Sequence, residues 1–523
     1  MKRCRSRAAV RWEWLAVLAT VLVARPPGAA AQGPPPSLSP AAESGSPADL
    51  TTRFHFLERY SSTEERSRLD AIGPYKVGVR ETNKVVNEKP QGAPERDEWT
   101  TQTIYTERPA RMSGSATVSA VVRRYETFQQ VPDPSAQPSR PRPLEGLTIW
   151  YQSQPGEAPQ VLSLVPDRGL REDEFQIIDR QVFLPELSAL LPAPPVRIGD
   201  KWRIPPARLA ALLGDRPVRG NPLTGTLKEV RKGVKGPTWE ATLGVTGRVL
   251  LPAGETRVNA VVRFQFPPPS PEAAPASGKG NGDESTVEAP GAILEVRMAL
   301  SSSAALPGTS GRLKKISTRD VVVSRQLSTQ GATLTPPETP PTPTEANSWL
   351  TYEDPLGRFH FRHPQSHRPV PQPDSNSVLL NDPRPLGPDP IDLRLQVGAD
   401  RQRLDPEFHR KQLEAEWDRN HFEVIRGPAE WLDDPSWEKA KMRVFRIEAA
   451  LSLGSPTTRT VQRVHADYYL VLLPRESLFV TSMTGQDPPL PFRKQVETLI
   501  RTFRLDSPTP MPTPTATDAG RAR

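Results

Sequence analysis

The sequence predicts an α+β protein with two folded regions, and three observations support this class. Between residues 50 and 330 apolar and polar residues alternate, which predicts mainly antiparallel β structure, a curved sheet or half-barrel with a short helical insertion. From residue 348 to 506 strand patterns are mixed with two helical ones. A Thr/Pro-rich segment at 331–347 separates the regions, and we expect an extended linker there that buries no side chain.

The chain begins with the pattern of a secretory signal peptide. Basic residues lie within 2–11, an apolar stretch occupies 14–24, and small residues at 29–31 complete a cleavage site. The apolar stretch is shorter than the about 20 residues that span a bilayer. We therefore expect residues 1–31 to be removed and the mature protein to be secreted or periplasmic, with no transmembrane segment. The single cysteine, Cys4, precedes the apolar stretch, so no lipid attachment is expected.

Composition excludes several classes of function. The net charge is +8, and the signal peptide carries most of it, which leaves no basic patch interleaved with aromatic residues and argues against nucleic-acid binding. A mature chain without cysteine cannot form thiol nucleophiles or zinc–thiolate sites. Serine-hydrolase, P-loop, dinucleotide, HExxH and EF-hand motifs are absent from the sequence. We expect no cofactor.

Four further segments are rich in Pro, Ala, Ser, Thr or Gly and poor in apolar residues, and we expect them to be disordered. They are residues 32–49, two insertions at 132–143 and 267–290, and a tail at 507–523. The folded domains are therefore expected at 50–330 and 348–506.

Period-two alternation gives the strands of the first domain. They are expected at 52–56, 75–79, 99–105, 116–122, 147–151, 161–165, 224–230, 239–251, 258–266, 293–300 and 312–327. The helical insertion is expected at 173–179, 184–191 and 206–213. The acidic run 172–174 suits the first turn of a helix better than an acid/base pair.

The insertion ends in LPAPPVRIGDKWRIP, residues 191–205. This segment resembles one found in exported, uncharacterised β-rich bacterial proteins. From the residues themselves, Gly199 and Asp200 predict a turn, and Trp202 is expected to be a core aromatic on a strand.

The second domain opens with a hairpin whose turn is expected at 354–357. Strands follow at 377–380, 391–397, 422–425, 440–453, 461–473 and 478–483, with a helix at 405–420. A closing helix is indicated by one apolar stripe: Phe492, Val496, Leu499, Ile500 and Phe503.

This order of elements, with the opening motif at 352–364, resembles the PsbP-like family over about 160 residues. The resemblance implies an α/β/α sandwich and a non-catalytic, extracytoplasmic binding module. The proline-rich loop at 383–390 departs from the family pattern, so no binding surface is carried over.

Three histidines form the best candidate for a metal site: His360, His363 and His367. Imidazole suits Zn²⁺, Cu²⁺ or Ni²⁺. On a strand, however, His360 and His363 point to opposite faces, and no nearby carboxylate orients an imidazole. We expect exposed histidines and no metal.

The remaining candidate site combines two carboxylates with two tryptophans: Trp431, Asp433, Asp434 and Trp437. Aromatic rings stack on sugars while carboxylates bind hydroxyl groups, but a turn between strands with inward tryptophans also explains the pattern. We expect an exported, non-enzymatic binding or scaffolding protein of the bacterial cell envelope, with an unknown protein or envelope component as partner. The alternative is a secreted hydrolase or carbohydrate-binding protein that uses these four residues.

Overall fold

The computed structural model describes two compact units of the chain, which meet in the sequence between Thr351 and Tyr352. The signal peptide and the 32–49 and 507–523 segments lie outside the described residues. The structure describes residues 52–506 except 59–73, 90–91, 113–117, 132–142, 154–158, 167, 207–218, 234–237, 252–253, 269–285, 306–313, 327–333, 373–376, 382–391, 399–404, 420–422, 455–460, 474–475 and 486–488.

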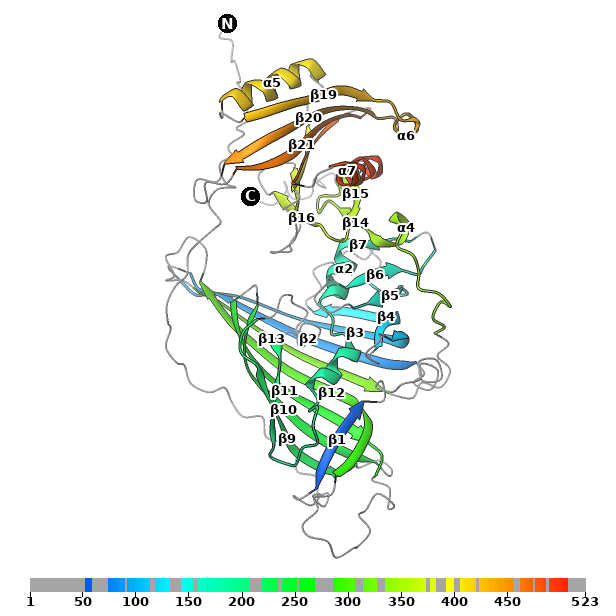
Figure 1. The fold of residues 1–523 in the computed structure, drawn as a ribbon, viewed down its shortest axis with the longest axis vertical. Helices are drawn as coiled ribbons and strands as arrows, with labels where there is room; N and C mark the ends of the chain where they lie inside the picture. The colour runs from blue at the N-terminus through cyan, green and yellow to red at the C-terminus, as the bar shows by residue number, and fades with distance from the viewer. Residues whose placement is uncertain are drawn as a thin grey trace, which may run out of the picture. The chain divides into compact units, whose positions relative to one another are not determined.

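The N-terminal unit is built on one large, curved and unclosed antiparallel sheet (Figure 1). Its neighbouring strands run in the order β6-β5-β4-β3-β2-β13-β12-β11-β10-β9-β8, and β1 pairs in parallel with the start of β12. The strands are β1 (Arg53–Glu58), β2 (Tyr75–Asn87), β3 (Glu95–Met112), β4 (Val118–Val131), β5 (Thr148–Gln152), β6 (Gln160–Ser163), β8 (Lys201–Ile204), β9 (Leu223–Lys232), β10 (Trp239–Leu251), β11 (Gly254–Phe266), β12 (Thr286–Ala305) and β13 (Lys314–Gln326).

Alternation in these strands fills one core, as the sequence predicts. On β2, Tyr75, Val77 and Val79 are buried while the residues between them are partly exposed. Phe54 and Phe56 of β1 belong to the same core. The short strand β7 (Leu170–Arg171), the helix α2 (Glu172–Asp179) and the 3₁₀ helix η2 (Leu184–Leu190) supply the helical insertion. The helix expected at 206–213 falls largely outside the described residues.

The turn and the core tryptophan of the 191–205 segment are confirmed. Gly199 has a φ of +93°, a conformation that favours glycine. Trp202 is buried on β8 and donates a hydrogen bond from Nε1 to the Leu190 carbonyl oxygen at 3.1 Å. A Cβ atom on Gly225 would lie 2.2 Å from Cε2 of Trp202, so the glycine makes room for the indole ring.

The Thr/Pro-rich segment is not an empty spacer. Leu334 is only 7% exposed and packs with Trp150 on the sheet face opposite the main core. Arg108 donates a hydrogen bond to the Leu334 carbonyl oxygen at 3.2 Å. The segment ends in α4 (Glu345–Ser348), where Asn347 accepts a hydrogen bond from the Thr344 amide at 2.8 Å. The expectation that this segment buries no side chain is therefore wrong at Leu334.

The C-terminal unit contains a seven-stranded antiparallel sheet in the order β16-β17-β18-β22-β21-β20-β19. The β14 strand (Trp349–Glu353) leads into the unit, and β15 (Phe359–Pro364) pairs with β23 (Arg504–Leu505). The sheet strands are β16 (Arg368–Gln372), β17 (Ser377–Asn381), β18 (Asp392–Gly398), β19 (Glu423–Leu432), β20 (Arg443–Gly454), β21 (Val461–Leu472) and β22 (Ser477–Thr484).

Helices cover both faces of this sheet, which makes the unit an α/β/α sandwich (Figure 1). The α5 helix (Pro406–Arg419) places Trp417 on one face, in a cluster with Ile447 of β20. The α7 helix (Leu490–Thr502) covers the other face and forms an ion pair with Arg446, the neighbour of Ile447. The predicted apolar stripe of α7 is buried, although Phe503 caps the helix rather than continuing it.

In the C-terminal unit three short elements were not predicted: β16, β23 and the helix α6 (Pro435–Lys439). The strand expected at 422–425 extends to Leu432. No helix among the described residues combines the length and apolar character needed to cross a membrane.

Candidate functional site

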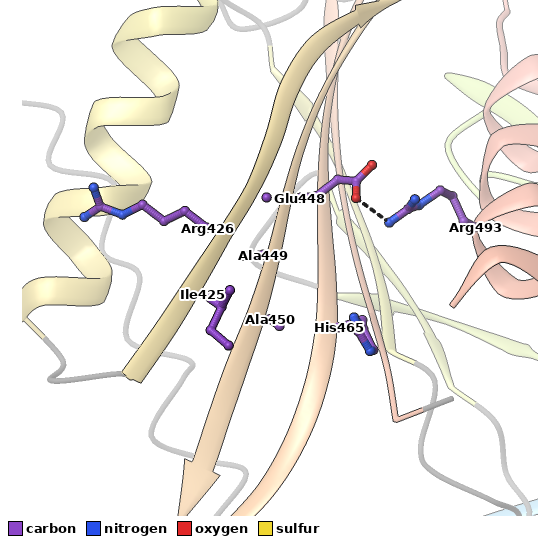
Figure 2. A pocket seen from close by; sticks show the side chains of 8 residues that line it. Ile425, Arg426, Glu448, Ala449, Ala450, His465 and Arg493 are labelled. Carbon is purple, nitrogen blue, oxygen red and sulfur yellow. Dashed lines mark ion pairs between the residues drawn. The ribbon is translucent and has the colours of Figure 1, made fainter. Parts of the chain in front are cut away.

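A small cavity opens in the C-terminal unit where α7 begins, next to the edge strand β19 (Figure 2). Its volume is about 120 Å³, below the roughly 300–1,000 Å³ of small-molecule sites. The space suits a single side chain or a few waters. Residues from four elements line it: Ile425, Arg426, Gly427, Glu448, Ala449, Ala450, His465 and Arg493.

A β-bulge in β19 forms one wall of the cavity. The register with β20 shifts between Arg426 and Ala429, so β19 has one residue more than its partner over this stretch. A Cβ atom on Gly427 would lie 2.8 Å from the Cβ of Glu448, which is closer than side chains approach. Pro428 fits here because a bulge on an edge strand needs no N–H for the ladder.

The floor of the cavity is held by ion pairs to Arg493. This guanidinium group donates to both carboxylate oxygens of Asp467 at 3.0 Å and contacts Glu448 at 2.9 Å. Burial lowers the pKa of Arg493, but the hydrogen bonds and charge of Asp467 outweigh burial and raise it. Arg493 therefore stays protonated and is held in one position. It forms the floor of the cavity and does not act as a proton donor.

A second arginine continues the network towards the sheet edge. Arg446 contacts Glu430 at 2.7 Å, Glu448 at 2.8 Å and Glu497 at 2.9 Å. Arg446 is only 13% exposed, whereas Glu430 is 51% exposed on β19. The network thus runs from the sheet interior to its open edge.

The edge itself carries exposed apolar side chains. Ile425 is 58% exposed and Trp431 is 39% exposed. Their partners on β20 differ by five positions, Ala450 and Phe445, so the two side chains lie on opposite faces of the sheet. Among the described strands, β19 pairs only with β20.

The structure divides the predicted Trp–Asp cluster. Asp434 caps α6 and accepts hydrogen bonds from the Ser436 amide at 2.8 Å and from Arg501 at 2.7 Å. The Ser436 bonds, followed by Arg501, lower the pKa of Asp434. Trp437 is buried, with Arg501 stacked 5.2 Å from its ring centre. These two residues therefore serve the packing of α6.

The other two members of that cluster remain at the surface. Trp431 packs edge-on against Phe445 at 5.3 Å, and Arg443 lies 4.2 Å from its ring centre. Asp433 is exposed. Only Trp431 of the four contributes to the β19 edge.

The histidines depart from expectation. His363 is fully buried and His367 is 2% exposed, so the expectation that they are exposed is wrong. On β15, His363 shares the buried face with Phe359 and Phe361, because residues two apart on a strand point the same way. His360 contacts Asp506 at 2.8 Å. Within the described residues, no three His, Cys, Asp or Glu side chains form a metal-binding group.

The acidic run near residue 172 begins a helix, as expected. Glu174 accepts a hydrogen bond from the Arg171 amide at 3.0 Å and another from Arg168 at 2.6 Å. Glu172 and Glu174 are buried at the start of α2. The first contact belongs to the capping box of α2, and the second is an ion pair, so neither indicates an acid/base pair.

The sequence did not reveal a buried ion pair in the N-terminal unit. Glu107 and Arg123 are directly opposite each other on β3 and β4, form a salt bridge and have no exposed side-chain surface. Tyr75 donates a hydrogen bond to Glu107. The sequence contained a signal for this pair. Glu107 lies two residues after the buried Tyr105, and Arg123 two residues after the buried Val121, so each points to the same face of its strand as a core residue.

Aromatic rings enclose the buried guanidinium group. Arg123 lies 4.9 Å from the ring centre of Tyr105 and 4.7 Å from that of Tyr151. Tyr125 donates a hydrogen bond to Gln181 at 2.8 Å. Burial raises the pKa of Tyr125 to about 12, although Arg123 opposes the shift. This arrangement is part of the core of the N-terminal unit.

Comparison with known proteins gives similarity to solved structures only. No protein-family model and no curated protein matches the chain. Among solved structures, the solution structure of cyanobacterial PsbP (CyanoP) from Synechocystis sp. PCC 6803 matches at 12% identity and a TM-score of 0.24. The match covers 30% of this chain and 92% of that chain. It concerns a PsbP-like fold only and does not bear on function.

Proposed function

We propose that this chain is an exported, non-enzymatic binding protein of the bacterial cell envelope, and that its C-terminal unit binds a protein partner along β19. Export is inferred from the signal-peptide pattern at 1–31. The binding role is inferred from the site. One observation carries it: the two edges of the seven-stranded sheet differ in their ability to pair.

The β16 edge is protected. Pro369 and Pro371 alternate along this five-residue strand and have no N–H to donate. Proline is tolerated in a sheet only where its nitrogen points away from the neighbouring strand, so the nitrogens of both prolines point to the open side of β16. Without N–H groups on that side, β16 cannot pair regularly with a further strand. Natural proteins use this device against unwanted pairing.

The β19 edge is ten residues long, and its only proline lies at the bulge. It also exposes Ile425 and Trp431, large apolar side chains of the kind that proteins use to bind partners. A long edge with exposed apolar residues is a template for pairing with another chain. This supports a binding role for the β19 edge.

Site-specific cross-linking in cells tests the proposal. A photoreactive benzoylphenylalanine is placed at Ile425 on β19, or at Val370 on β16, which is 41% exposed and serves as the matched control. We expect one protein to be cross-linked from position 425 in the envelope fraction. The purified cross-linked protein should also bind the full chain. Absence of a cross-linked protein, or equal cross-linking from both edges, would overturn the proposal.

A further inference from the structure

We infer that the partner presents an extended segment that joins β19 as an additional antiparallel strand, with a basic side chain opposite Glu430 and apolar side chains opposite Trp431 and Ile425. The inference rests on the proposed function of the β19 edge and specifies the chemistry of the partner. Antiparallel pairing is expected because every described pair in this sheet is antiparallel.

The register between β19 and β20 shows the residue spacing that a partner strand must have. Trp431 pairs with Phe445 and Ile425 pairs with Ala450. The two positions are therefore six residues apart on the bulged strand β19 but only five residues apart on a regular strand such as β20. Five steps place the first and last side chains on opposite faces, where Trp431 and Ile425 lie. A partner running antiparallel to β19 therefore needs an apolar residue, and a second one five positions later.

Charge defines the position after the first apolar residue. There the partner faces Glu430, as Arg446 does on β20. The charged residues of β19 and those that form ion pairs with them are four carboxylates and two guanidinium groups: Glu414, Asp418, Glu423, Glu430, Arg426 and Arg446. This excess of negative charge favours a basic side chain in the partner.

The cavity gives the second apolar side chain a place to pack. Ile425 lines it together with Ala450 on the same face of the sheet. A side chain opposite Ile425 adds apolar contact at the mouth of this small space without entering the ion-paired floor at Arg493. The predicted segment thus has the pattern apolar, basic, three residues of any type, apolar.

A synthetic peptide tests this pattern on the full chain. The probe is acetyl-Thr-Phe-Lys-Thr-Thr-Thr-Val-Thr-amide, and the control peptide has Glu in place of Lys. Binding is measured by calorimetry, and the site by amide hydrogen exchange of β19. We expect the Lys peptide to slow exchange in β19 and to bind about fivefold more tightly than the Glu peptide, since one cross-strand charge pair contributes about 1 kcal/mol.

Variants localise the effect. In Glu430→Gln the preference for the Lys peptide should fall to near one, Ile425→Lys should weaken both peptides, and Val370→Lys on β16 should change neither. Unchanged exchange in β19 at millimolar peptide, or a preference that survives Glu430→Gln, would overturn the inference. If position 425 still cross-links a partner in that case, the proposed function stands and the partner binds as a folded surface instead. If cross-linking from position 425 also fails, both the inference and the proposed function are wrong.

Discussion

The two units contain the same cross-strand pair in opposite surroundings. Glu107 faces Arg123 on β3 and β4 of the N-terminal unit, where neither side chain is exposed. Glu430 faces Arg446 on β19 and β20 of the C-terminal unit, where the glutamate is 51% exposed. The first pair lies between inner strands of a large sheet, and the second at a sheet edge.

Position in the sheet decides what each pair does. Burial removes water from Glu107 and Arg123, so each charge depends on the other and on its hydrogen bonds, such as that from Arg123 to the Val182 carbonyl oxygen at 3.3 Å. Water solvates Glu430 whether or not Arg446 is near. Loss of one partner of the buried pair should therefore destabilise the fold, whereas the edge pair leaves a carboxylate accessible to a binding partner.

The largest expected effect is on the buried pair. Glu107→Gln keeps the side-chain shape but leaves the Arg123 guanidinium buried without its counter-charge, which should cost about 3 to 5 kcal/mol. Because a chain of two units need not unfold in one step, stability is read from hydrogen exchange of the β3 and β4 amides. A control, Glu98→Gln, affects the exposed ion pair with Lys84. Equal costs in the two variants would contradict our interpretation of the buried pair.

Alkaline pH tests the buried surroundings of the N-terminal pair. Burial raises the pKa of Tyr125 to about 12, above the ordinary value of 10. The unfolded chain therefore loses this proton first, so the tyrosine's contribution to stability is complete below pH 10 and is lost between about pH 10 and 12. The loss should reach about 2 to 3 kcal/mol in the N-terminal unit.

The Tyr125→Phe variant removes this titration and gives the comparison needed. It should start less stable, because Gln181 loses a hydrogen bond, and then fall less steeply between pH 10 and 12. The measurement is hydrogen exchange of β4, corrected for the intrinsic effect of pH. Parallel curves for the variant and the wild type would show that Tyr125 does not titrate as its burial requires.

Periodicity predicted much of the architecture. The alternation at Phe54 and Phe56, the capped helix near Glu172 and the buried stripe around Leu499 all followed from local pattern, and the structure bears them out. These features depend on residues close together in the chain. The prolines of β16 concealed a strand, because proline usually argues against one except at an edge.

The candidate site was not predictable in the same way. Its cavity needs a bulge at Gly427, a histidine at position 465 and the start of α7, which lie far apart in the sequence. Local composition offered the Trp–Asp cluster only as an alternative site, and Asp434 and Trp437 contribute to the packing of α6. The pair of Glu107 and Arg123 was missed for another reason: charged residues in a strand are normally assigned to its solvent face, although both residues share strand parity with buried neighbours.

The smallest expected effect tests the edge pair and completes the comparison. Glu430→Gln makes the same chemical change as Glu107→Gln, but at a carboxylate that water already reaches. Arg446 keeps its contacts with Glu448 and Glu497, so the variant should cost between about 0 and 1 kcal/mol, as exposed pairs do. Hydrogen exchange of the β20 amides in the free chain measures this cost. A loss as large as that of Glu107→Gln would mean that Glu430 is structural, and that its exposed carboxylate is not available to a partner.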